Sequence, residues 1–157
     1  MDRLFTLFDD QFSKIDADAR ALLAQISDDQ LFWRPSDRGG LAPFSIGEYV
    51  VRSAAMVEKA FGGITTRLWD DPFEWTLPEK LFTKTAIGTY LDEVEETRAR
   101  AFESFGSDAD LLLEIPSPVT LRPLGQILLG SIALARHYQG RAFAIQQLLS
   151  DEPLPRL

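Results

Sequence analysis

Cysteine is absent from this chain of 157 residues, and histidine occurs once, at His137. The absence of cysteine excludes disulfides, thiolate nucleophiles and any cysteine-ligated zinc or iron–sulfur site. A single histidine also excludes a site of two or three histidines within one chain. Two interpretations of His137 stay open: it holds a metal together with carboxylates, or it is a surface or partly buried histidine that binds nothing.

Acidic residues outnumber basic residues in this chain, and long apolar runs are missing. The chain has 16 Lys and Arg against 24 Asp and Glu, which gives a formal net charge of −8. This charge argues against nucleic acid as a partner, because a phosphate backbone binds a basic face, and against anionic membrane surfaces as well. No apolar run is long enough to span a bilayer, and the acidic residues close to the first methionine are unlike a signal peptide. We therefore expect a cytoplasmic protein with no membrane partner.

The rest of the composition is that of a globular protein. Hydrophobic residues make up 45% of the chain and charged residues 25%. A chain of this length buries a full hydrophobic core without disulfides or metals. We expect one domain that covers residues 1–157.

Helical periodicity dominates the chain. Apolar residues recur every three or four positions in four long segments, with charged residues on the opposite face. This pattern predicts long helices over 2–26, 45–68, 84–105 and 122–149. Two capping boxes support the boundaries, since Ser27 is followed three residues later by Gln30, and Ser45 by Glu48. The first box predicts a short extra helix, and the second opens the second long helix.

Two proline-containing segments separate the helices. The segment 69–83 has two prolines and no clear period, so we interpret it as a crossover loop between the second and third long helices. The segment 107–122 contains Pro116 and Pro118 and is also interpreted as a loop. Four long helices predict an all-α protein, a four-helix bundle with no substantial sheet. Because the crossover is too long for a tight hairpin, the helices that it joins need not be antiparallel.

Charged residues at the start of the second long helix are the first candidate site. Glu48 and Arg52 are four residues apart and can pair on one face of the helix. One interpretation is a helix cap joined to a structural salt bridge. The other is a charged pair that points into a cleft, where burial would strengthen the pair and shift its titration.

A polar patch in the last helix is the second candidate site. Leu134, His137, Tyr138 and Arg141 lie at i, i+3, i+4 and i+7 and therefore share one face. Such a group on a long buried helix lines a pocket, or it marks a solvent-facing end of the molecule. The sequence leaves both interpretations open.

Two stretches of the chain resemble the signature of a known family. The first is Leu31–Pro35, with the letters LFWRP, followed after a polar gap by Ser45–Arg52, SIGEYVVR. The second is His137–Arg141, HYQGR, in the last helix. Together with the order and length of the helices, they are similar to the DinB-like (DinB/YfiT) superfamily of metalloenzymes over essentially the whole chain. The resemblance implies a four-helix bundle with up-down-down-up topology, in agreement with the long crossover.

The metal ligands of that family are missing from this sequence. The resemblance implies a divalent metal held by three histidines, one from the second long helix and two from the last. The matching positions here are Arg52, Leu134 and Tyr138. His137 lies beside a ligand position, but roughly 100° away around the helix. We therefore expect no bound metal and no cofactor.

The guanidinium of Arg52 stands where the resemblance places the metal. Its fixed positive charge would repel a cation, and its planar donors suit a carboxylate or a phosphate. Alternatively, Glu48 neutralises it. The expected remnant pocket consists of the three former ligand positions and their polar neighbours: Arg52, Leu134, Tyr138, Glu48, Tyr49, His137 and Arg141.

Two classes of function stay open. The first is a metal-free protein, as a monomer or a homodimer, that binds a small anion or a partner. The second is an enzyme, because some members of the family are metal- and thiol-dependent transferases or isomerases. Such an enzyme would use Arg52, His137 and Tyr138 without a metal.

Overall fold

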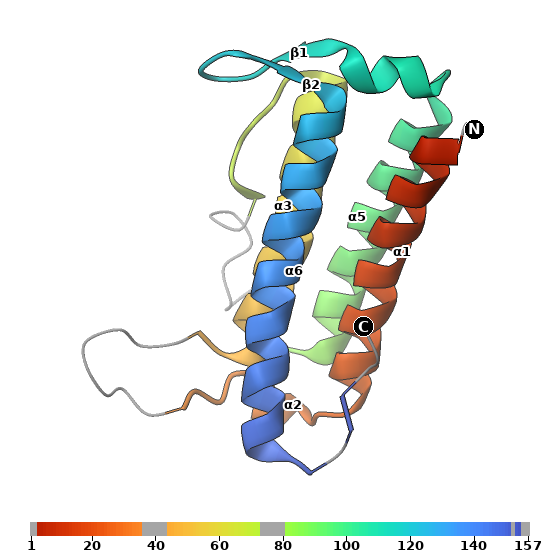
Figure 1. Cartoon of the computed structure of the whole chain (residues 1–157). Coiled ribbons are helices and arrows are strands. Elements are labelled where there is room, and N and C mark those ends of the chain that lie inside the picture. The colour runs from red at the N-terminus through yellow and green to blue at the C-terminus, as the bar shows by residue number, and fades with distance from the viewer. Residues whose placement is uncertain (1–2, 36–43, 73–80, 152, 155–157) are drawn as a thin grey trace.

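The chain is mostly helical (Figure 1). The computed structural model describes residues 3–35, 44–72, 81–151 and 153–154. Its helices are α1 (Arg3–Ala24), the short α2 (Asp28–Leu31), α3 (Ile46–Thr66), α5 (Lys84–Glu103) and α6 (Leu124–Leu149). The prediction of a mainly helical protein is confirmed, and each long helix ends within two residues of its predicted bounds. Within the described ranges, no helix is long and apolar enough to cross a membrane.

Both predicted capping boxes are present. The Ser27 hydroxyl accepts a hydrogen bond from the Gln30 amide at 3.3 Å, and the Gln30 side chain accepts one from the Ser27 amide at 3.0 Å. At the start of α3, the Ser45 hydroxyl accepts from the Glu48 amide at 3.3 Å, and the Glu48 carboxylate accepts from the Ser45 amide at 2.8 Å. These reciprocal bonds satisfy donors that a helix start otherwise leaves unpaired, so the local sequence sets where α2 and α3 begin.

The two predicted loops have different outcomes. Most of the crossover 69–83 lies outside the described residues. The other segment is not a plain loop, because it contains three short elements: η1 (Asp108–Leu112), a 3-10 helix, and the antiparallel strands β1 (Glu114–Pro116) and β2 (Leu121–Pro123). The amide of Ser117 donates to the carbonyl of Thr120 at 3.1 Å and closes the turn between the strands. Strands of three residues are too short to show the alternation that identifies a strand in a sequence.

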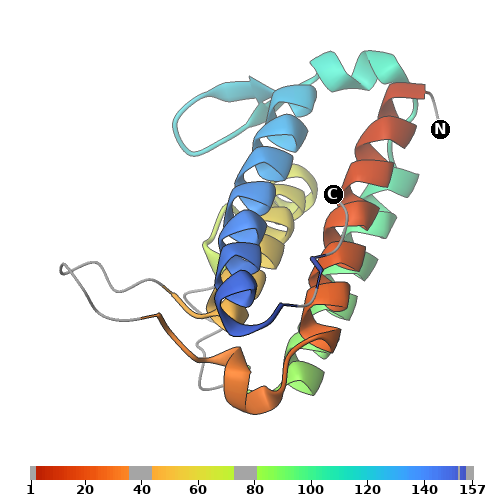
Figure 2. The same cartoon turned by 60° about the horizontal axis from the view of Figure 1, so that its bottom comes forward.

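Helix α3 packs most extensively on α6, while α5 packs against α3 and α1, and α1 packs against α6 and α5 (Figures 1 and 2). Two hydrogen bonds fix the register of α3 and α6. The Ser53 hydroxyl donates to the Ala135 carbonyl at 2.9 Å, and the Ser131 hydroxyl donates to the Met56 carbonyl at 3.0 Å. From the first bond to the second, the residue number rises from 53 to 56 on α3 and falls from 135 to 131 on α6, so the two helices are antiparallel. Helices α3 and α5 both begin at the end where α2 lies, whereas α1 and α6 begin at the end with the hairpin (Figure 1).

A group of phenylalanine rings joins α1, α3 and α5. The ring centroid of Phe12 lies 5.1 Å from that of Phe61 and 6.0 Å from that of Phe102. Phe5 packs edge-on against Phe102 at 6.2 Å. All four side chains are buried. Because burying a side chain of this size contributes about 1.5–3 kcal/mol, these rings are a main source of cohesion between three of the long helices.

Candidate functional site

The register between α3 and α6 brings the two candidate segments together. The hydroxyl of Ser53 bonds to a main-chain carbonyl of α6, so its neighbour Arg52 lies level with Leu134 and Tyr138. Tyr49, almost one turn before Arg52, stacks on Tyr138 with ring centroids 6.4 Å apart. Residues that are about 90 positions apart in the chain therefore form one site.

Two guanidiniums and three rings meet at this junction, which we call the arginine–aromatic cluster: Phe44, Tyr49, Arg52, Tyr138 and Arg141. The Arg52 guanidinium lies over the Phe44 ring, 3.8 Å from its centroid. Phe44 packs edge-on against Tyr49, with centroids 5.6 Å apart. On α6, the Arg141 guanidinium donates a long hydrogen bond of 3.4 Å to the Tyr49 hydroxyl. A guanidinium over an aromatic face gains about 0.5–2 kcal/mol, so the rings orient both cations.

Glu48 caps its helix and pairs with an arginine from the preceding segment. Its carboxylate accepts from the amide and the hydroxyl of Ser45, both at 2.8 Å, and forms an ion pair with Arg34 at 2.6 Å. Glu48 is buried, whereas Arg34 is about half exposed. The spacing indicated Arg52 as a possible partner of Glu48, but it could not indicate Arg34, which is fourteen residues from Glu48 in the chain.

Leu134 and His137 lie on the outer side of α6. Leu134 is 50% exposed, and His137 is exposed as well. The His137 ring packs edge-on against that of Tyr138, with centroids 5.4 Å apart. Tyr138 and Arg141 contact Tyr49 of the arginine–aromatic cluster, although Arg141 is exposed, as Leu134 and His137 are. The patch therefore borders the cluster at the surface of the protein. In the part of the chain that the structure describes, no group of three or more His, Asp or Glu side chains is placed to hold a metal ion.

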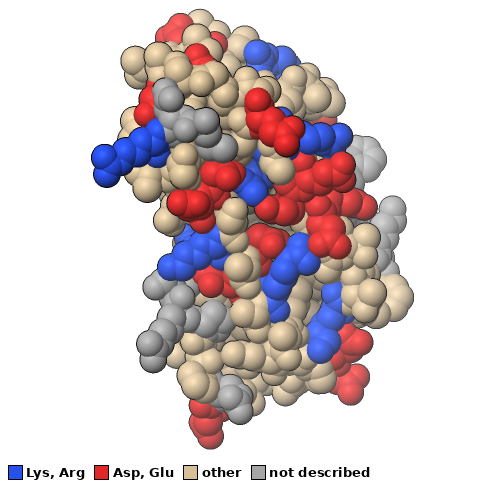
Figure 3. Space-filling model, turned by 90° about the vertical axis from the view of Figure 1, so that its right-hand side faces the viewer, with Lys and Arg blue, Asp and Glu red and all other residues tan. Residues whose placement is uncertain are grey.

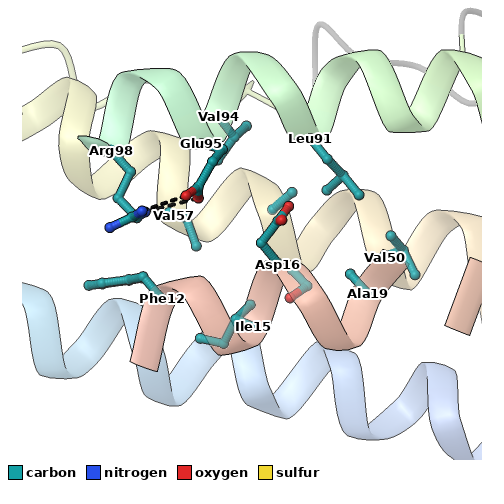
Figure 4. A pocket seen from close by; sticks show the side chains of 12 residues that line it. Phe12, Ile15, Asp16, Ala19, Val50, Val57, Leu91, Val94, Glu95 and Arg98 are labelled. Carbon is teal, nitrogen blue, oxygen red and sulfur yellow. Dashed lines mark hydrogen bonds and ion pairs between the residues drawn. The ribbon is translucent and has the colours of Figure 1, made fainter. Parts of the chain in front are cut away.

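A narrow cavity between α1, α3 and α5 is a second concave feature (Figure 4). Its volume is only about 20 Å³, enough for about one water molecule, and its lining is mainly apolar. Asp16 on α1 and Glu95 and Arg98 on α5 are the charged groups of the lining. The sequence analysis did not single out this site, although a signal was present. Arg98 falls on the apolar stripe of its helix, four residues after Val94, where a charged side chain is rare.

Arg98 ties α5 to α1 beside this cavity. Its side chain is 6% exposed. It donates to the Glu95 carboxylate at 2.9 Å on its own helix and pairs with Asp9 on α1. Burial lowers the pKa of Arg98. Burial and the nearby carboxylate of Asp16 raise the pKa of Glu95, and Arg20 opposes this rise.

A wider groove lies between the C-terminal halves of α3 and α5, beside η1 and β1. Hydroxyl groups are frequent in its lining. Three of them already donate to carbonyls of their own helices: Thr65 to Phe61 at 2.7 Å, Thr97 to Glu93 at 2.9 Å, and Ser104 to Ala101 at 2.6 Å. These donors stabilise the helix ends and do not converge on a common point, in contrast to the arginine–aromatic cluster.

No family model, no curated protein and no solved structure matches the chain. The chemistry of the site therefore follows from its own geometry, in which two arginines and three rings meet at the junction of α3 and α6.

Proposed function

We propose that this protein binds a small anion, a carboxylate or a phosphate, at the arginine–aromatic cluster and without a metal. The observation that carries the proposal is the environment of Arg141. Among the described residues no carboxylate pairs with Arg141, and its guanidinium bonds to the hydroxyl of Tyr49. A guanidinium has five N–H donors, so most of them stay available for a ligand. Arg52, almost one turn along α3 from Tyr49, provides the second positive charge.

Local charge at the start of α3 favours an anion although the whole protein is acidic. The guanidiniums of Arg34, Arg52 and Arg141 surround this end of the helix together with the carboxylate of Glu48. Planar guanidinium donors match two oxygens of a carboxylate or phosphate. The neighbouring rings would contact the apolar part of the ligand.

We also propose that the chain is a divergent member of the DinB-like superfamily with an up-down-down-up four-helix bundle. The shared direction of α3 with α5 and of α1 with α6 supports this topology. The height of Arg52 along the helices, level with Leu134 and Tyr138, supports the correspondence with the three ligand positions of the family, whereas Leu134 is 50% exposed and is not part of the cluster. In this proposal Arg52 supplies the positive charge that the metal supplies in the family, in a cytoplasmic protein.

Thermal unfolding tests the anion site. Inorganic phosphate and acetate are titrated against chloride at constant ionic strength into the wild type, Arg52→Leu and Arg141→Gln. The control is Arg100→Gln, at an exposed arginine of α5. An anion at ten times its dissociation constant stabilises the folded protein by about 1.4 kcal/mol. For a domain of this size that is a rise in Tm of roughly 3–6 °C.

We expect this rise in the wild type and the control, and its loss in the two cluster variants. An equal rise in all four proteins, or no rise with either anion, contradicts the proposal. Elemental analysis after dialysis against a chelator is expected to find no stoichiometric nickel or zinc, and about one retained metal ion per chain would contradict the metal-free site. Consumption of a low-molecular-weight thiol that depends on Arg52 and Tyr138 would favour the alternative, a transferase or isomerase.

A further inference from the structure

The groove between the ends of α3 and α5, which we call the α3–α5 groove, has the size and lining of a small-molecule site. Its volume is about 660 Å³, within the range of about 300–1,000 Å³ that is typical of ligand pockets. The buried part of its lining is apolar and comes from four elements: Ile64 of α3, Ala101 of α5, Ile115 of β1 and Leu124 of α6. This apolar lining can cover the hydrocarbon part of a ligand.

Four hydroxyl groups line the groove as hydrogen-bond acceptors. Thr66 donates its proton to the Gly62 carbonyl at 2.7 Å. Thr65, Thr97 and Ser104 donate theirs to other carbonyls of their own helices. A hydroxyl has a single O–H donor but two acceptor lone pairs. A ligand that bonds to these oxygens must therefore supply the hydrogen-bond donors.

The charges around the groove favour a cation. Both α3 and α5 end there, and the C-terminal end of a helix carries a partial negative charge. Asp110 adds a carboxylate close to the end of α5. Two arginines oppose this charge. Arg67 donates to the Ile64 carbonyl at the end of α3, and Arg100, which is 68% exposed, lies 4.0 Å from the Glu96 carboxylate. The negative charge is therefore concentrated at the end of α5 and at Asp110.

The surface beside the groove has the same sign. Helix α5 contains five Asp and Glu against three Lys and Arg. Asp and Glu side chains are frequent on the face that α1 and α5 present in Figure 3, and the whole chain has a net charge of −8. A cleft beside a face of one sign attracts ligands of the opposite sign. A cation is therefore attracted to this groove, and an anion is repelled from it.

We propose that the α3–α5 groove binds a small hydrophobic amine in its ammonium form. An ammonium group has three N–H donors and no acceptor, so it matches hydroxyl oxygens and a carboxylate. It lies at the end of α5 beside Asp110, and its hydrocarbon part covers the apolar lining. For a ligand of about nine non-hydrogen atoms, the dissociation constant is in the high micromolar to millimolar range. The site is independent of the anion site, because Arg52 and Ile64 are about 18 Å apart along α3.

Backbone-amide NMR spectra of the isotope-labelled protein test the site with phenethylamine, which is protonated at neutral pH. Phenethyl alcohol and hydrocinnamate, similar in shape but neutral and negative, are titrated in parallel. The spectra also show whether each variant is folded.

Two variants change the charge of the groove, each with a matched control. Thr97→Lys adds a positive charge to the lining. Its control, Thr89→Lys, adds the same charge at an exposed threonine of α5 whose hydroxyl also donates to its own helix. Asp110→Asn removes a negative charge but keeps an oxygen that can accept from the Gly106 or Ser107 amide. Its control, Asp29→Asn, removes the same charge in α2, at the opposite end of the molecule (Figure 1).

We expect phenethylamine to shift the amides of the groove and phenethyl alcohol to bind at least about threefold more weakly. Binding of the amine should weaken about tenfold in Thr97→Lys and about threefold in Asp110→Asn. The two controls should stay within about twofold of the wild type. Hydrocinnamate should leave the amides of the groove unshifted.

Three results would overturn the proposal. The first is a wild type in which millimolar phenethylamine shifts no amide of the groove. The second is binding of the alcohol or of hydrocinnamate in the groove as tightly as the amine. The third is binding of the amine by Thr97→Lys and Asp110→Asn that equals binding by their controls. None of these results bears on the arginine–aromatic cluster, whose test uses phosphate and acetate.

Discussion

Arg98 is the buried cation between α1 and α5, and Arg98→Met tests how much the fold depends on it. The guanidinium donates to Glu95 through two nitrogen atoms and pairs with Asp9. Methionine has an unbranched side chain that can occupy the space of the Arg98 side chain between α1 and α5 without its charge. The variant leaves the two carboxylates, which are 35% and 29% exposed, without their cation.

The expected loss of stability follows from this partial burial. Removing one partner of a fully buried ion pair costs about 3–5 kcal/mol. Because both carboxylates are about one-third exposed, water recovers part of their solvation, and we expect a loss of about 2–3 kcal/mol at neutral pH. The matched control is Arg100→Met on the same helix, where the guanidinium lies 4.0 Å from Glu96 and both side chains are about 70% exposed. That pair contributes less than about 0.5 kcal/mol.

The pH dependence of unfolding provides a second readout. Burial and the Asp16 carboxylate raise the pKa of Glu95 above its ordinary value of 4.5. The ionised carboxylate therefore costs stability above the raised pKa, and this cost disappears as the pH falls toward the ordinary value. Without Arg98 the pKa of Glu95 should rise further, so Arg98→Met should regain part of its deficit between neutral pH and about pH 4.5. Urea unfolding at neutral and mildly acidic pH measures both effects. A deficit no larger than that of Arg100→Met, or one that is unchanged in acid, would refute this reasoning.

Three further predictions concern packing and capping, all measured by urea unfolding. Gln146 is fully buried, and its amide nitrogen and oxygen have no hydrogen-bond partner among the residues that the structure describes, so Gln146→Leu should raise stability by about 1–2 kcal/mol; a loss would point to an ordered water or ligand at the amide. A Cβ at Gly63 would overlap the Trp69 ring, while one at Gly88 would meet none of the described residues within 4 Å. Gly63→Ala should therefore lose about 1–3 kcal/mol and Gly88→Ala should gain up to about 1 kcal/mol, and equal effects would contradict this difference in packing. Ser45 is buried at the start of α3, so Ser45→Ala should cost about 1–2 kcal/mol, and an unchanged stability would mean that the cap is dispensable.

Helix positions in this protein were determined by the sequence itself. The capping boxes at Ser27 and Ser45 act over three residues, and the apolar period acts over three or four, so both are visible in a short window of sequence. For the same reason the predicted bounds of α1, α3, α5 and α6 lie within two residues of the observed ones. The short strands beside η1 were missed because three residues do not establish a period.

Partners of the charged residues were decided only by the tertiary structure. Glu48 pairs with Arg34, which is fourteen residues away in the chain, and Arg141 bonds to the hydroxyl of Tyr49, which is 92 residues away. No local spacing encodes such contacts, because they depend on the register in which separate helices pack.

The orientation of α6 was also set by packing. A periodic pattern identifies a buried face only where the opposite face is polar, and α6 is apolar on nearly all sides. Sequence alone therefore could not separate Leu134, which is half exposed, from Leu128, which is fully buried. The contacts of α6 with α3 and α1 select the inner face, since only one rotation of the helix lets Ser131 reach α3 while Gln139 reaches α1. That rotation leaves Leu134 and His137 exposed and turns Tyr138 and Arg141 toward Tyr49.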